Sequence, residues 1–73
     1  MKYVYVKLLE EGTEAYRPVP ALLIESNIYK LLGHKIHDPL DEIWEFLPDT
    51  IVQTKVREIV DKKLLIAVKA VED

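Results

Sequence analysis

The only cluster of side chains with the composition of a metal site lies in one polar segment. His34 and His37 stand three residues apart, and Asp38 and Asp41 follow them. Imidazole and carboxylate groups bind zinc, but a catalytic zinc site needs three protein ligands that further hydrogen bonds hold in place. Two histidines beside Pro39 are more typical of an exposed loop than of a fixed ligand set. We therefore expect no bound metal.

Side chains for covalent catalysis are scarce. The chain has no cysteine, and Ser26 is its only serine. With two glycines, Gly12 and Gly33, it has no glycine-rich phosphate loop. A chain of 73 residues also has little material to enclose a ligand pocket, which usually measures about 300 Å3 or more. We expect a protein that is not an enzyme and has no cofactor.

The charge distribution argues against nucleic acid as the partner. The net charge is −3, and the ten basic residues are scattered along the chain. Binding to phosphates is driven by counterion release onto clustered Lys and Arg side chains, which this sequence lacks. The segment 38–49 has five acidic residues and no basic one. Such a run usually forms a solvated face.

Period-two alternation of apolar side chains predicts five or six short strands. In the segment 2–9, for example, Val4, Val6 and Leu8 point to one side and their neighbours point to the other. The segments with strand character are 2–9, 16–24, 28–32, 43–47, 51–60 and 64–71. A loop over 34–42 and a hairpin turn over 61–63 separate the later ones. The last strand is apolar on both faces, which predicts a central position.

Two prolines interrupt the second of these segments. Pro18 and Pro20 each lack the N–H group that a ladder of hydrogen bonds needs. A central strand does not tolerate this, so we expect an edge strand or a bulge there.

The segment 40–60 also fits a helical pattern. Leu40, Ile43, Trp44 and Leu47 have the spacing of one helical face, and Asp38 is a suitable cap residue. Within 51–60, however, six of the ten residues are β-branched and favour a pleated surface. We therefore predict strands, with the Trp44 side chain substantially buried.

These elements predict an all-β fold. The chain 1–73 is expected to form one small domain, either a barrel or a two-sheet sandwich of SH3-like size. The alternative is an α+β domain with a short helix within 40–60.

Two specific segments are Arg17-Pro18-Val19 and Trp44-Glu45-Phe46. Through these segments the chain resembles a group of small uncharacterised bacterial proteins. In that group the second segment commonly runs into a Pro-Gly turn, whereas Asp49 follows Pro48 here. The resemblance favours strands over 43–60 and implies no activity.

A non-catalytic protein-interaction or regulatory module is the function that we expect. Tyrosine, tryptophan and arginine are enriched where proteins meet, and the acidic run offers charge for recognition. The candidate partner-binding residues are Tyr16, Arg17, Asp38, Asp41, Glu42 and Glu45. We expect a protein partner or self-association, no membrane partner and a cytoplasmic location. The alternative is a small nucleic-acid-associated barrel in which Trp44 and Phe46 stack on bases.

Overall fold

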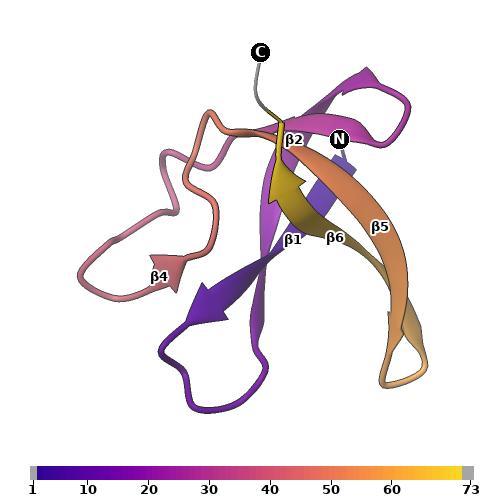
Figure 1. The fold of residues 1–73 in the computed structure, drawn as a ribbon. Coiled ribbons are helices and arrows are strands. Elements are labelled where there is room, and N and C mark those ends of the chain that lie inside the picture. Colours follow the sequence, from indigo (N-terminus) through magenta and orange to yellow (C-terminus); the bar gives the residue numbers. More distant parts are fainter. Residues whose placement is uncertain (1, 72–73) are drawn as a thin grey trace.

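The computed structural model describes residues 2–71, and these residues form six strands and no helix (Figure 1). The strands are β1 (Lys2–Leu9), β2 (Tyr16–Glu25), β3 (Ile28–Leu31), β4 (Ile43–Trp44), β5 (Ile51–Ile59) and β6 (Lys62–Ala70). The predicted all-β class is confirmed, and the α+β alternative is wrong. In the described part of the chain, no helix has the length and apolar character that crossing a membrane requires.

Five of the strands close into a ring. The order around it is β1, β2, β3, β5 and β6, and all pairs are antiparallel except the contact between β6 and β1. That contact is a single parallel bridge between Tyr5 and Ile66. The short β4 pairs with the end of β1, at Leu8 and Leu9. The result is a small barrel-like domain whose weakest seam lies between its first and last strands.

The core follows from the alternation in β1. Val4, Val6 and Leu8 are buried, whereas Tyr5 and Lys7 between them are half-buried and exposed, respectively, as the sequence predicts. Side chains from all six strands complete the core: Val19, Ala21, Tyr29, Leu31, Trp44, Val52 and Ala67 join the three from β1. Burial of these side chains stabilises the fold by roughly 25 cal/mol for each Å2 of apolar surface removed from water.

The two prolines lie where β2 has only one neighbour. β2 pairs with β1 in its first half and with β3 in its second half. The N–H of Leu32 donates to the carbonyl of Pro20 (2.8 Å), so residue 20 faces away from β1. Because backbone groups alternate between the two edges of a strand, Pro18 faces the same way. The prolines therefore remove no hydrogen bond from the β1–β2 ladder, and a register shift follows between Leu23 and Glu25.

The last strand lies between β5 and β1, which agrees with the predicted central position, although it joins β1 through one bridge only. It starts earlier than the sequence suggests. The turn falls at Val60 and Asp61, and β6 begins at Lys62. A register shift in the β5–β6 ladder leaves Val68 as an additional residue in β6. This bulge breaks the simple alternation of inward and outward side chains in β6.

The segment after the predicted loop forms less strand than expected. Strand pairing covers Ile43 and Trp44 only, so the prediction of a strand over 43–47 is wrong beyond residue 44. The N–H of Glu45 still donates to the carbonyl of Lys7 (2.9 Å), after which the chain turns away. The Trp44 side chain is 3% exposed, which confirms its predicted burial. Phe46 also packs against the core.

Candidate functional site

The six candidate partner-binding residues fall into three places rather than one surface. Arg17 lies beside Glu42, Tyr16 and Glu45 line one groove, and Asp38 and Asp41 belong to the loop before β4. Each place has its own geometry.

Arg17 and Glu42 fix the indole of Trp44. The Trp44 Nε1–H donates to Oε1 of Glu42 (3.2 Å), and the same oxygen lies 3.4 Å from Nε of Arg17. That Arg17 nitrogen is buried and makes no hydrogen bond within the described residues. Glu42 thus neutralises it as a close ion pair. This trio serves packing, so it has less freedom to bind a partner than the sequence suggests.

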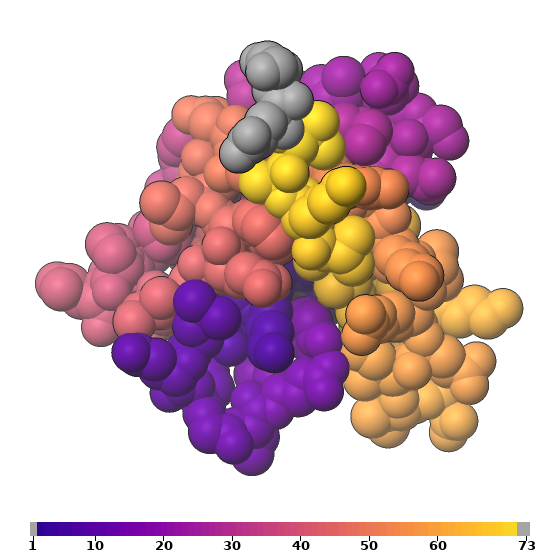
Figure 2. Space-filling view, viewed as in Figure 1, coloured from indigo at the N-terminus to yellow at the C-terminus, as the bar shows by residue number. Residues whose placement is uncertain are grey.

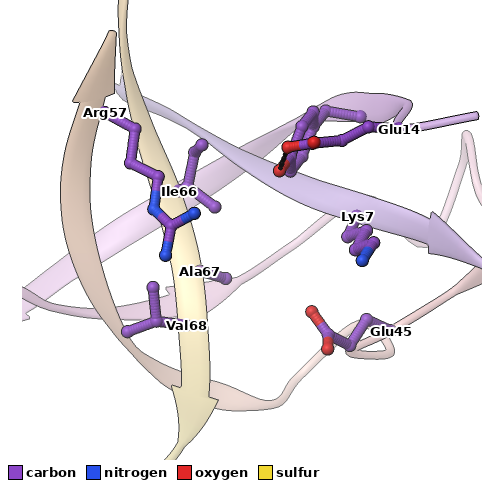
Figure 3. Close-up of a pocket in the computed structure, with 8 residues that line it drawn as sticks. Lys7, Glu14, Glu45, Arg57, Ile66, Ala67 and Val68 are labelled. Carbon is purple, nitrogen blue, oxygen red and sulfur yellow. Dashed lines mark hydrogen bonds between the residues drawn. The ribbon is translucent and has the colours of Figure 1, made fainter. Parts of the chain in front are cut away.

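Tyr16 and Glu45 face an open groove between β6 and the end of β4 (Figure 3). Its volume is about 300 Å3. The lining residues are Lys7, Glu14, Tyr16, Glu45, Arg57, Ile66, Ala67 and Val68. Two acids and two bases balance the charge of the groove, and its floor is the apolar part of β6. The side chains contributed by β1, the β1–β2 turn and β5 have no local sequence signal, because the fold alone brings them together.

The Tyr16 hydroxyl donates a hydrogen bond to Oε1 of Glu14. This bond to a carboxylate raises the pKa of Tyr16 above its ordinary value of 10.0, and partial burial adds to the shift. A neutral phenol beside a carboxylate orders the rim of the groove. It offers no activated nucleophile.

The loop before β4 contains two turns, one closed by the carbonyl of Gly33 and a second, tight turn held by Asp38. The second turn has three hydrogen bonds to Asp38. Oδ1 of Asp38 accepts the N–H of Leu40 (3.0 Å), and the Asp38 carbonyl accepts the N–H groups of Asp41 and Glu42 (2.9 Å each). This turn is all that forms of the predicted helical alternative. It places the Leu40 side chain in solvent, 98% exposed.

Two further apolar residues of the segment 38–49 are exposed. Ile43 is 44% exposed and Leu47 is 55% exposed, and both lie in the acidic run. We call the set Asp38, Leu40, Asp41, Ile43 and Leu47 the acidic loop surface. Sequence reasoning proposed its acids Asp38 and Asp41 but not its apolar residues, because neither the predicted loop nor the predicted strand shows that Leu40, Ile43 and Leu47 remain exposed.

The two histidines have different partners. His34 Nε2 lies 2.9 Å from Oδ1 of Asp49, and the ring of His37 packs on Trp44 with centroids 4.6 Å apart. Between residues 2 and 71, no group of three or more His, Cys, Asp or Glu side chains is placed to hold a metal ion.

Comparison with models of known protein families, with curated proteins and with solved structures gives no match.

Proposed function

We propose that the protein is a small non-catalytic interaction module that binds another protein through the acidic loop surface. The observation that carries this proposal is Leu40, whose side chain is 98% exposed on a turn that three hydrogen bonds to Asp38 hold in shape. A large apolar side chain fixed in water costs free energy, and contact with a partner recovers about 1.5–3 kcal/mol of it. An ordered turn also loses little conformational entropy when it binds.

The composition of this surface defines the chemistry of its partner. Ile43 and Leu47, which precede and follow the buried Trp44 in the chain, add further exposed apolar side chains to this segment. Asp38 and Asp41 place negative charge at its rim, and complementary charge speeds association and excludes wrong partners. The matching surface is apolar at its centre and carries lysines or arginines around it.

The burial of the aromatic residues argues against the nucleic-acid alternative. Trp44 is 3% exposed, so its ring is not available for base stacking, and Phe46 is half-buried against the core.

Comparative affinity purification tests the proposal. Tagged wild type, Leu40→Ser and the double variant Asp38→Lys, Asp41→Lys are used as baits. Leu22→Ser is the matched control, since Leu22 is also exposed (53%) but lies on β2. We expect wild type and Leu22→Ser to capture the same protein and both loop variants to lose it. Equal capture by all four baits contradicts the proposed surface, as does micromolar binding of wild type to a single-stranded oligonucleotide that weakens steeply with salt.

A further inference from the structure

A second exposed apolar surface lies at the tip of the β5–β6 hairpin. Val60 is 87% exposed and Val56 is 60% exposed. The segment 55–63 contains four basic and two acidic side chains, so its net charge is +2. We call the set Lys55, Val56, Val60, Lys62 and Lys63 the basic hairpin surface. It wraps around the tip: Lys62 lies beside the turn on the same face as Lys55, and Lys63 lies on the opposite face with Val56, across from Glu58.

Val60 is held in a backbone conformation that valine disfavours. Its φ is +46°, and the following Asp61 has a φ of +63°. Turns of this type favour Asn and Gly, because a β-branched side chain in the left-handed region is strained. At 87% exposure, Val60 gains little packing within the chain to offset that strain. The turn requires this backbone but not a valine, so the exposed Val60 side chain points to a role in contact with another molecule.

The two surfaces are complementary. The acidic loop surface lies in the segment 38–49, which has five acids and no base, and the hairpin segment is net positive. Each surface presents one almost fully exposed apolar side chain, Leu40 on one and Val60 on the other. Figure 2 shows the loop and the hairpin projecting from different sides of the barrel. Within one chain the acidic loop surface and the basic hairpin surface lie apart, so each is free to bind a second copy.

We propose that the protein self-associates head to tail, with the basic hairpin surface of one copy bound to the acidic loop surface of the next. This inference rests on the proposed function and names its partner as a second copy of this chain. Leu40 of one copy packs against Val60 of the other, and Lys62 and Lys63 face Asp38 and Asp41. Because the two surfaces differ, the contact is heterologous, and each added copy leaves one surface of each kind free. The assembly grows as a short chain or closes into a ring.

The contact is expected to be weak and sensitive to salt. Each surface comprises few side chains, and interfaces of small area are usually transient. Exposed ion pairs are screened at physiological ionic strength within about 8 Å. Association should therefore depend on protein concentration and decrease as salt is added.

Sedimentation velocity with two complementary variants tests this geometry. The loop variant carries Leu40→Ser and Asp41→Lys, and the hairpin variant carries Val60→Asn and Lys62→Glu. We expect wild type to associate with rising concentration and each variant alone to bind itself at least about tenfold more weakly. An equimolar mixture should recover association but stop at a pair, because the loop variant retains its hairpin and the hairpin variant retains its loop. Leu22→Ser should associate as wild type does.

Three results would overturn the head-to-tail contact. The first is a wild-type protein that stays monomeric up to about 1 mM. The second is an equimolar mixture of the two variants that stays monomeric. The third is self-association that is weakened in only one of the two variants. The first of these leaves the proposed function intact if Leu40→Ser still abolishes capture of a different protein. If the loop variant captures and self-associates as well as wild type does, both proposals are wrong.

Discussion

Gly33 lies directly against Trp44. A Cβ atom on Gly33 would stand 3.3 Å from Cη2 of Trp44 and 3.0 Å from Cγ1 of Val19. The backbone at Gly33 has a φ of +96°, outside the range that other residues adopt easily. The missing side chain therefore lets the long loop leave β3 and lets the indole enter the core at the same point.

Gly33→Ala should destabilise the protein more than Gly12→Ala. Both glycines have positive φ, but a Cβ at Gly12 meets no atom of residues 2–71 within 4 Å. Gly12→Ala carries the backbone strain alone, about 1–2 kcal/mol. Gly33→Ala adds overpacking against Val19 and Trp44, for about 1–3 kcal/mol more. Urea unfolding measures the two free energies, and equal losses would contradict the close packing at Gly33.

Glu42→Ala should lower the free energy of unfolding by about 1 kcal/mol, whereas Glu45→Ala should leave it almost unchanged. Glu42 accepts the indole hydrogen bond and neutralises the buried Nε of Arg17, while Glu45 lies on the rim of the groove. The same urea experiment decides this. In addition, tryptophan emission of the folded wild type should be that of a buried indole, and a spectrum of fully hydrated indole would contradict the burial of Trp44.

Val60→Asn should stabilise the monomer by about 1 kcal/mol. Asparagine tolerates the left-handed backbone of this turn, whereas valine is strained there, and the exposed Val60 side chain loses little packing. The measurement is made at low protein concentration, so that self-association does not contribute. Ile59→Asn is the comparison, since Ile59 lies in β5 and is partly buried, and it should be destabilising. A less stable Val60→Asn would show that the turn is not strained.

The hydrogen bond between Tyr16 and Glu14 predicts a loss of stability in alkali. The pKa of Tyr16 is raised in the folded state, so the protonated phenol stabilises the folded protein. This contribution to the free energy of unfolding is fully present below the unfolded pKa of 10.0. It is lost as pH rises through the folded pKa. The free energy of unfolding should therefore fall more steeply above about pH 10 in wild type than in Tyr16→Phe or Glu14→Gln. Identical curves for the three proteins would contradict the raised pKa.

The strands were predictable where the side chains of one segment are enough to decide its structure. Alternation places Val4, Val6 and Leu8 in the core, and the β-branched residues of 51–60 overcome a helical spacing that fits equally well. Burial of Trp44 followed from its apolar neighbours in the same way. These features depend on side chains close together in the sequence.

The remaining features depend on contacts that the sequence does not encode locally. The hairpin turn was predicted too late because Val60 is a poor residue for the backbone it adopts. The charged groove was missed because Glu14 and Arg57, which are far apart in the sequence, line the same groove only once the ring of strands has closed. The ion pair between Arg17 and Glu42 depends on where Trp44 inserts, because the indole N–H and Nε of Arg17 share one oxygen of Glu42.

A concentration series followed by heteronuclear NMR tests the account most directly. If the acidic loop surface binds the basic hairpin surface of a second copy, the backbone amide signals of 38–47 and 55–63 shift together as concentration rises. Both sets should follow one binding curve, reverse on addition of salt, and leave the outer face of β2 around Leu22 unchanged. Shifts in only one of the two sets, or none up to about 1 mM, would contradict it.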